Sequence, residues 1–336
     1  MQINFRTNNA ELIQEIESIV AQWNSSIDSF SVQTSGSTGS PTSIVLLKQH
    51  MLASAKMTGE YLNLKENDKA LLCLSPKTIG GIMMIVRAIV LRLDLFVVTP
   101  SSNPLKSCTD QIDFIAMVPL QLSNVIDESL DKFRGIKCSI IGGGVISPEL
   151  IQKIEVNALN CLQTFGMTET ISHIAMRKIT LENLSYQVLG DVRVSDNAGK
   201  LVIDSNQLGI ESIETNDLVE IISAKSFNWI GRSDFIINTG GVKVNPAKIE
   251  EQLSQLIPTV FFMHGLPDEV LGNRVVLCVT KDCTIAFSTE LLEKYLNRFE
   301  MPKEVYIFSS FIETKSGKIN RVETTKSLQD AEKKVL

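Results

Sequence analysis

The sequence predicts an α/β fold in which a large N-terminal domain precedes a small α+β domain. Short apolar, β-branched runs alternate with amphipathic helical stretches through the first two thirds of the 336 residues, which is typical of a mostly parallel sheet covered by helices. From about Val188 the strands become short and alternating, which indicates a small antiparallel β appendage. A further change near Ser233 divides the chain into predicted domains at residues 1–233 and 234–336.

The first predicted element is an amphipathic helix near the N-terminus. Leu12, Ile16, Ile19 and Trp23 recur at helical spacing behind an asparagine that can cap the helix. The segment lacks the unbroken apolar stretch of a signal peptide, so it gives no indication of export.

A longer apolar segment, residues 79–98, could span a bilayer by its length. Arg87, Arg92 and Asp94 interrupt it, and charges at membrane depth are costly. We therefore expect a buried helix followed by a strand, and no membrane partner.

The remaining elements of the first domain follow in order. Buried strands are expected within ALLCLS, LFVV, FIAMVP, KCSIIGGG and CLQTFG, with helices over residues 120–133 and after Ser147, where a serine cap precedes a proline. Hairpin strands are expected on either side of the turn DNAG.

The second domain has its own predicted order. We expect a glycine-punctuated hairpin at NTGG and a helix that buries Ile249, Leu253 and Leu256. A strand at RVVLCVT, a helix over TELLEKYLNRF, a strand at EVYIF and a polar loop ending at SGKINR complete it.

Charge and cysteine content narrow the class of partner. The chain carries 32 Lys and Arg against 38 Asp and Glu, a net charge of −6, which gives no reason to expect nucleic acid or an anionic membrane. A small diffusible molecule is the better expectation. The six cysteines are scattered, without a C-x-x-C pair or a nearby histidine that would complete a zinc site, so we interpret them as buried thiols in a reducing cytoplasm.

The segment QTSGSTGSPTSIVLLK, from Gln33 to Lys48, combines glycines and hydroxyl side chains ahead of an apolar run. Glycines let the backbone approach a ligand, and successive backbone N–H groups can form a nest that binds anions. Such a loop can hold a polyphosphate, although it lacks the Gly-Lys-Ser/Thr of the Walker pattern. A serine-rich linker or a plain turn explains the same residues equally well.

Two motifs that follow predicted strands also offer ligand-binding groups. The three glycines of IIGGGVISPEL precede a capped helix, where open α/β sheets bind ligands and where a flat ring can lie against the backbone. In TFGMTET, Phe165 offers an aromatic face, Thr168 a hydroxyl and Glu169 a carboxylate for Mg²⁺. Taken singly, the glycines are equally compatible with a tight turn, and a lone glutamate is more often a solvated surface residue.

Two more candidates lie later in the chain. Asp217 could accept both hydroxyls of a ribose, and Arg232 could bind sugar or phosphate oxygens. Lys318 lies in the glycine-containing segment TKSGKINR. Alone, the first two would be interpreted as surface ion-pair residues and Lys318 as an exposed solubilising lysine.

The order of these motifs favours a ligand-binding role for all of them. TSGSTGSPT, IIGGGVISPEL, TFGMTET, an Asp ahead of WIGRSDFIINTGGVKVNPAKIE, and SGKINR resemble, in this order, the signature motifs of the adenylate-forming superfamily. That superfamily includes acyl-CoA synthetases, luciferases and peptide-synthetase adenylation domains. The resemblance extends from about Thr34 to Arg321 and implies ATP-dependent, Mg²⁺-dependent conversion of a carboxylic acid to an acyl adenylate, followed by transfer of the acyl group to CoA.

By position, the resemblance gives each motif a role. The catalytic residues would be Lys318, Glu169 and Thr168, with Glu169 as the Mg²⁺ ligand. Asp234 would be the interdomain hinge, and the loop with Gly240 and Gly241 would line the tunnel for the pantetheine of CoA. The residues that would bind ATP and AMP are Thr34, Ser35, Gly36, Ser37, Thr38, Gly39, Gly142, Gly143, Gly144, Phe165, Gly166, Asp217 and Arg232.

Within the superfamily, the segment LLCLSPKTIGGIMMIVRAIV and the wording GMTET resemble the o-succinylbenzoate-CoA ligases of menaquinone biosynthesis. An arginine inside such an apolar helix is costly unless it is paired, which favours a functional partner for it, although a buried Asp or Glu would serve equally well. The resemblance implies a pocket for a dicarboxylate aromatic acid formed by Thr78, Gly80, Gly81, Arg87, Ser172 and His173.

The sequence departs from the superfamily pattern in three places. Thr42 stands where a lysine is usual after the proline of the phosphate loop, and Lys77 and Thr78 stand where relatives often have histidine or an aromatic residue. The region before the phosphate loop is far shorter than in relatives, so we expect a trimmed N-terminal domain. Pairing with a second copy of the chain would cover the surface that this exposes.

Three alternatives to an o-succinylbenzoate ligase stay open. An aryl- or fatty-acyl-CoA synthetase would keep every nucleotide residue and change the acid pocket. A carrier-protein adenylation enzyme would load a protein thiol in place of CoA. A nucleotide-binding protein that no longer catalyses is the third, and the presence of Glu169, Asp217 and Lys318 argues against it.

Overall fold

The structure is a computed structural model that describes residues 2–33, 43–144, 146–313 and 319–336. The helices are α1 (Ala10–Asn24), α2 (Lys48–Leu62), α3 (Ile79–Leu91), α4 (Pro119–Arg134), α5 (Pro148–Val156), α6 (Pro246–Leu253), α7 (Thr289–Leu292) and α8 (Arg321–Lys326). The strands before residue 233 are β1 (Ile3–Phe5), β2 (Ser29–Gln33), β3 (Ser43–Leu47), β4 (Lys69–Leu72), β5 (Asp94–Val97), β6 (Phe114–Met117), β7 (Cys138–Ile141), β8 (Cys161–Gly166), β9 (His173–Lys178), β10 (Ser185–Val188), β11 (Arg193–Asn197), β12 (Lys200–Ser205), β13 (Ile210–Ser223) and β14 (Ser226–Arg232). The later strands are β15 (Ile237–Thr239), β16 (Val242–Val244), β17 (Phe261–Asp268), β18 (Gly272–Thr280), β19 (Glu304–Phe308) and β20 (Glu332–Val335).

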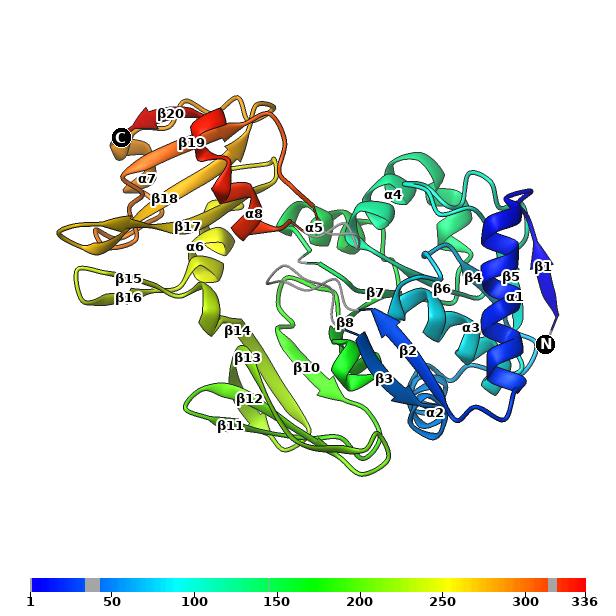
Figure 1. Cartoon of the computed structure of the whole chain (residues 1–336). Coiled ribbons are helices and arrows are strands. Elements are labelled where there is room, and N and C mark those ends of the chain that lie inside the picture. Colours follow the sequence, from blue (N-terminus) through cyan, green and yellow to red (C-terminus); the bar gives the residue numbers. More distant parts are fainter. Residues whose placement is uncertain (1, 34–42, 145, 314–318) are drawn as a thin grey trace.

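Twelve strands form one large sheet in the order β1-β5-β4-β6-β7-β8-β9-β10-β14-β13-β12-β11 (Figure 1). The strands from β1 to β8 in this order are parallel, and every pair from β8 to β11 is antiparallel. The predicted fold class is confirmed. The antiparallel strands differ from the expected appendage in one respect, because they continue the hydrogen-bonding ladder of the parallel strands.

Helices cover both faces of the parallel strands, and the two-residue repeat of a strand explains how. In β4, Ala70 and Leu72 point to the core shared with α1, α2 and α3, while Leu71 points to the core shared with α4 and α5. Phe114 and Ile115 of β6 alternate in the same way. Strands buried on both faces need continuous apolar runs, which is the pattern that predicted them.

Helix ends follow the predicted caps. The side chain of Asn9 accepts a hydrogen bond from the N–H of Leu12 at 3.1 Å at the start of α1, and Ser147 accepts one from Leu150 at 3.2 Å at the start of α5. Residues 79–98 form the buried helix α3 and then β5, as expected. Across the described ranges of the chain, no helix has the length and apolarity to cross a membrane.

The second sheet has the order β16-β15-β18-β19-β20, with β17 paired to β18, and α6 packs on it through Ile249 and Leu253. The helix expected over TELLEKYLNRF is wrong beyond Leu292, where α7 ends. The N–H of Tyr295 bonds the carbonyl of Leu292 at 2.9 Å in a turn, and the side chain of Asn297 accepts from the N–H of Phe299 at 3.0 Å. Such local bonds of an asparagine compete with helical ones.

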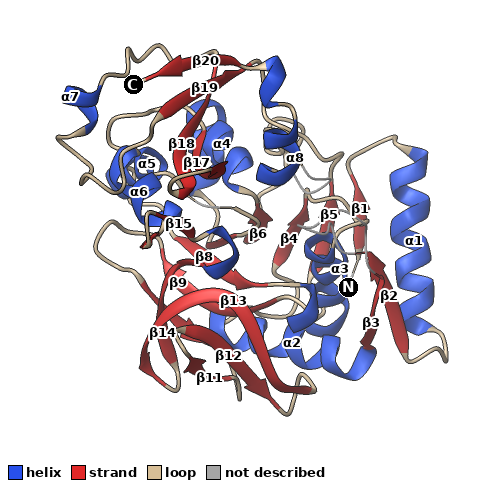
Figure 2. Cartoon of the chain, turned by 60° about the vertical axis from the view of Figure 1, so that its left-hand side comes forward, coloured by secondary structure: helices blue, strands red, loops and turns tan. Residues whose placement is uncertain are grey.

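Three short strands at the N-terminal end were not predicted. β1 adds to the edge of the large sheet by pairing Ile3 with Leu95, and β2 and β3 form a separate hairpin (Figure 2). In that hairpin Gln33 pairs with Ser43. The predicted phosphate-binding residues therefore connect two strands whose ends are hydrogen-bonded to each other.

Candidate functional site

The connection between β8 and β9 carries the motif TFGMTET and is tightly wound. A Cβ atom on Gly166 would lie 2.2 Å from the carbonyl oxygen of Ser172, so only glycine allows this approach. The hydroxyl of Thr170 accepts from the N–H of Met167 at 3.0 Å and contacts the carbonyl oxygen of Ser172 at 2.8 Å. These bonds fix the end of β8 against the start of β9.

Ile171, within this connection, has a φ of 67° although it is β-branched and only 2% exposed. A β-branched residue in this region is strained, at a cost of order 1–3 kcal/mol, and such strain persists where the surroundings over-determine it. The two residues that follow are Ser172 and His173. The strained residue therefore marks the point at which the chain turns these side chains toward α3.

Arg87 of α3 is the centre of the predicted acid pocket, and it is 1% exposed. Its Nη2 donates to the hydroxyl of Ser172 at 2.9 Å and lies 3.4 Å from Nδ1 of His173. Its Nε lies 3.4 Å from the hydroxyl of Thr58, on α2. The structure thus brings Arg87, Ser172 and His173 together as predicted and adds Thr58, which the sequence interpretation missed.

The electrostatics of this cluster are unusual. Burial lowers the pKa of the Arg87 guanidinium to about 9, and no carboxylate pairs with it among the residues that the structure describes. Burial, and then the charge of Arg87, hold the pKa of His173 well below its usual range. Within the described cluster the positive charge therefore belongs to Arg87 alone, and the alternative of a buried Asp or Glu partner is wrong for these residues.

Thr78, Gly80 and Gly81 shape the turn that leads into α3. The hydroxyl of Thr78 donates to the carbonyl of Ser75 at 2.8 Å and accepts from the N–H of Gly81 at 3.3 Å. A Cβ atom on Gly81 would lie 2.1 Å from the Ser75 oxygen. The single hydroxyl proton of Thr78 is therefore used within the turn, and a contact of these residues with an acid stays a prediction.

The glycines Gly142, Gly143 and Gly144 follow β7 and lie beside the end of β8. A Cβ atom on Gly142 would lie 2.5 Å from the hydroxyl of Thr164, the residue before Phe165. The ring of Phe165 packs edge-on against Tyr186 and Phe227, with centroid distances of 5.6 and 5.1 Å. The glycines and Phe165 thus lie at the carboxyl ends of the neighbouring parallel strands β7 and β8, where α/β sheets bind ligands.

Asp217 and Arg232 are cross-strand partners on β13 and β14. Trp229 donates its indole N–H to Asp217 at 2.8 Å, while Arg232 approaches the same carboxylate only to 3.9 Å. Arg232 instead binds Asp234 through two hydrogen bonds of 2.9 and 2.6 Å. The predicted ribose ligand is therefore held in place by tryptophan, and the predicted hinge residue is ion-paired to its neighbour.

Asp234 also borders a cavity of about 310 Å³ that lies against the second sheet. Phe235 and Arg321 line the same cavity, and the guanidinium of Arg321 lies 4.9 Å from the centre of the Phe235 ring. Arg321 is anchored in turn by two bonds of 2.7 and 2.8 Å to the partly buried Glu250. The chain segment between the two sheets is thus held by charged and aromatic contacts on both sides.

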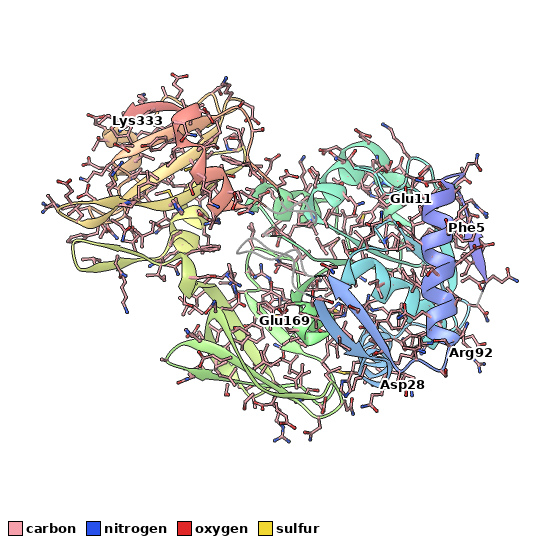
Figure 3. The ribbon with its side chains drawn as sticks, viewed as in Figure 1. Phe5, Glu11, Asp28, Arg92, Glu169 and Lys333 are labelled. Atoms are coloured by element: carbon pink, nitrogen blue, oxygen red, sulfur yellow. The ribbon has the colours of Figure 1, made fainter. Side chains whose placement is uncertain are left out.

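Glu169, Gly240 and Gly241 are exposed, as their predicted contacts with bound ligands require. Figure 3 shows Glu169 on the short turn after β8, in the middle of the molecule. No group of three or more metal-ligating side chains occurs in the described part of the chain. A single carboxylate still fits Mg²⁺, which usually combines one or two carboxylates with substrate phosphates and water. Gly240 and Gly241, with φ of 55° and 79°, form the exposed turn between β15 and β16.

Some predicted residues lie outside the described ranges. They are Thr34, Ser35, Gly36, Ser37, Thr38 and Gly39 of the phosphate loop, the atypical Thr42, and Lys318. A bridge between Glu313 and Ile319 joins the two ends of the segment that contains Lys318.

Comparison with known proteins gives a consistent result. The model of the family described as AMP-binding enzyme matches residues 25–220. The chain is 25% identical to the 2-succinylbenzoate–CoA ligase of Enterococcus faecalis over 85% of its own length and 67% of that protein. It is 25% identical to the ligase of the same name from Bacillus cytotoxicus, over 89% of the chain and 70% of that protein.

Two solved structures are also similar. An acyl-CoA synthetase (AMP-forming)/AMP-acid ligase II-like protein from Dyadobacter fermentans is 32% identical, with 96% of both chains covered and a TM-score of 0.64. The o-succinylbenzoate CoA synthetase from Bacillus subtilis, in complex with its acyl-adenylate intermediate, has a TM-score of 0.77 at 20% identity, over 91% of this chain and 70% of that one. The latter likeness concerns the fold.

Proposed function

The chain belongs to the AMP-binding enzyme family, and from this premise we propose that it is an ATP-dependent acid–CoA ligase whose acid is o-succinylbenzoate. It would adenylate one carboxylate of the acid and pass the acyl group to CoA. The names of the curated relatives support the choice of acid. The observation that carries the proposal is the unpaired charge of Arg87.

A buried arginine without an acidic partner needs an explanation. An uncompensated buried charge costs several kcal/mol, and a guanidinium is the group best suited to bind a carboxylate with two parallel hydrogen bonds. Ser172, His173 and Thr58 accept from Nη2 and Nε, which leaves the N–H groups of Nη1 without a partner among the described residues. The second carboxylate of a dicarboxylic acid would supply the missing negative charge.

The first half-reaction needs positive charge of its own. A carboxylate is a poor electrophile, and transfer of AMP to its oxygen creates a mixed anhydride with a good leaving group. The attack brings an anionic carboxylate to an anionic α-phosphate, so the ammonium of Lys318 would stabilise the charge that develops there. Mg²⁺, held through Glu169 and the ATP phosphates, would supply further positive charge when it is bound.

The remaining predicted residues would hold the nucleotide. Phe165 and the glycines Gly142–Gly144 would flank the adenine, because they lie at the carboxyl ends of the adjacent strands β8 and β7. Asp217, oriented by Trp229, would accept the ribose hydroxyls. Thr168 would contact the α-phosphate.

The second half-reaction would follow a rotation about Asp234. We propose a domain boundary at residues 233 and 234, between the last strand of the large sheet and the first strand of the second. Lys318 belongs to the small domain, so the rotation would withdraw it and bring the turn with Gly240 and Gly241 to the acyl adenylate. The Arg232–Asp234 pair would have to rearrange in this step.

Acid-dependent exchange of pyrophosphate into ATP, measured over a panel of acids, tests the proposal. A signal with o-succinylbenzoate, together with formation of its CoA thioester, is the expected result. A signal only with aryl or fatty acids would favour another acid–thiol ligase. Exchange without CoA consumption would favour a carrier-protein enzyme, and ATP binding without exchange would favour a protein that no longer catalyses.

We also propose that two copies of the chain associate. The outer face of β2 and β3 exposes Val45 (65%) and Leu47 (40%), and Ile27 beside it is 57% exposed. Exposed apolar patches of this kind mark interaction surfaces. Light scattering that gives a strictly monomeric mass would reject this part of the proposal. The free cysteines, five of them buried, support a cytoplasmic location.

A further inference from the structure

Thr58 is the one member of the Arg87 cluster that no sequence motif indicated. It is fully buried on α2, and its hydroxyl has three neighbours: the carbonyl of Ser54 at 3.0 Å, Nε2 of His173 at 2.9 Å and Nε of Arg87 at 3.4 Å. A hydroxyl has one proton and two acceptor sites. Its three neighbours can therefore be satisfied together in only one arrangement.

The donors and acceptors around the hydroxyl fix that arrangement. Arginine only donates, so Nδ1 of His173, 3.4 Å from Nη2 of Arg87, must present its lone pair to make a favourable contact. The neutral imidazole then carries its proton on Nε2, and this N–H donates a hydrogen bond to the hydroxyl of Thr58. The Thr58 hydroxyl accepts that hydrogen bond and donates one of its own to the carbonyl of Ser54.

The opposite tautomer fails on the same geometry. With the proton on Nδ1, an imidazole N–H would face the Nη2 of Arg87, and the contact would join two donors. A doubly protonated ring would do the same and would add a second buried positive charge. Among the contacts of Thr58, His173 and the Arg87 Nη2 group, only the Nε2–H form avoids placing two donors against each other.

We propose that Thr58 is a positioning residue for acid recognition: it holds His173 in the Nε2–H tautomer, so that the Nδ1 lone pair and Ser172 orient the Arg87 guanidinium toward the substrate. Its role in catalysis rests on the proposed function, since it sets how the second carboxylate of a dicarboxylic acid is bound. The tautomer itself does not depend on that function. The two can therefore be tested separately.

Nitrogen NMR tests the tautomer directly. The chain has only three histidines, so ¹⁵N-histidine labelling gives three ring systems, and His50→Gln and His264→Gln assign the remaining signals to His173. In the wild-type protein we expect a protonated Nε2 and an unprotonated Nδ1 on His173. In Thr58→Val, which keeps the shape of the side chain and removes the hydroxyl, we expect this preference to be lost, and in Thr58→Ser to be kept. A wild-type spectrum with the proton on Nδ1, or a tautomer unchanged in Thr58→Val, would overturn the inference.

Steady-state kinetics test whether Thr58 affects how the acid is bound. For Thr58→Val we expect the KM for o-succinylbenzoate to rise about 3- to 10-fold, the effect of losing one neutral hydrogen bond, with kcat within about twofold of wild type. For 4-oxo-4-phenylbutanoate, which lacks the ring carboxylate, the KM should not change, and Thr58→Ser should restore the wild-type KM for the diacid. Equal losses for both acids would reject the positioning role. If wild type activates neither acid, the proposed function fails, while the NMR result still decides the tautomer.

Discussion

Replacement of Arg87 by methionine should make the unliganded protein more stable and the enzyme worse. Burial lowers the pKa of the guanidinium to about 9, and the described residues provide no carboxylate to offset its charge. Replacing buried charged groups by well-packed apolar residues of similar volume stabilises proteins by about 1–4 kcal/mol in measured cases. Methionine is flexible and matches the length of the arginine stem, so we expect a gain within this range.

The same change should remove the charge that we propose binds the second carboxylate of the acid. Loss of a buried, hydrogen-bonded charge pair costs about 2–5 kcal/mol, so kcat/KM for o-succinylbenzoate should fall about 30-fold or more. For the analogue without the ring carboxylate the fall should be within about threefold, because that acid has no group to pair with Arg87.

The assay for Arg87→Met is urea unfolding without ligands, followed by kinetics with both acids. Arg87→Lys is the charged control, and it should lose activity without gaining stability, because an ammonium lacks the planar geometry of the guanidinium. Arg134→Met is the surface control, since the side chain of Arg134 is 52% exposed. A variant at position 87 that is strongly destabilised and equally impaired with both acids would refute the reasoning, because it would show that Arg87 is a structural residue.

Three further predictions concern other parts of the chain. Lys318→Ala should lower adenylation about 10²- to 10³-fold yet largely spare thioester formation from supplied acyl adenylate, and equal loss of both half-reactions would reject its role. The pKa of His173 is lowered in the folded protein, so the unfolded chain binds more protons below about pH 6.5. The free energy of unfolding should therefore decrease as the pH is lowered below that value, by at most about 1.4 kcal/mol per pH unit. In His173→Gln this contribution should vanish, and identical pH profiles of the variant and the wild type would contradict the prediction. Arg321→Met should destabilise the protein by about 1–3 kcal/mol because it leaves the partly buried carboxylate of Glu250 unpaired, and adding Glu250→Gln should recover part of the loss in a thermal melt; no recovery would show that the ion pair is not the cause.

The order of elements could be predicted because burial on both faces leaves a strong signal. The segments that form β4, β5, β6 and β7 are rich in apolar residues, and helices such as α1 and α5 carry their caps in the sequence, at Asn9 and Ser147. The short strand β1 carries no such signal, since three residues at a sheet edge gain their conformation from pairing with β5. The helix after Ser288 has the right apolar spacing, yet α7 ends at Leu292 and a turn follows it.

Some residues of the candidate site could also be predicted from the sequence, and others could not. Motif residues such as Phe165, Asp217 and Arg87 could be named because their types and order resemble a known family. Thr58 could not, because its role depends on α2 packing against α3 and β9, which no local pattern records. A weak signal was present, since Ser54 and Thr58 put two hydroxyls four residues apart on the buried face of an otherwise amphipathic helix.

The ion pair of Arg232 with Asp234 is the second feature that could not be predicted from the sequence. Both residues were named, one as a nucleotide ligand and one as a hinge, and the two bonds that join them appear only in the structure. If Arg232 binds the nucleotide, as the family resemblance implies, Asp234 loses its partner when ATP enters.

The most direct test of the central claim is the product formed from ATP, Mg²⁺, CoA and o-succinylbenzoate, identified by mass spectrometry and compared with the product from 4-oxo-4-phenylbutanoate. We predict the CoA thioester of o-succinylbenzoate, with kcat/KM at least about 30-fold higher than for the analogue, because only the diacid has a second carboxylate to pair with Arg87. Equal use of the two acids, or no thioester from the diacid, would contradict this prediction.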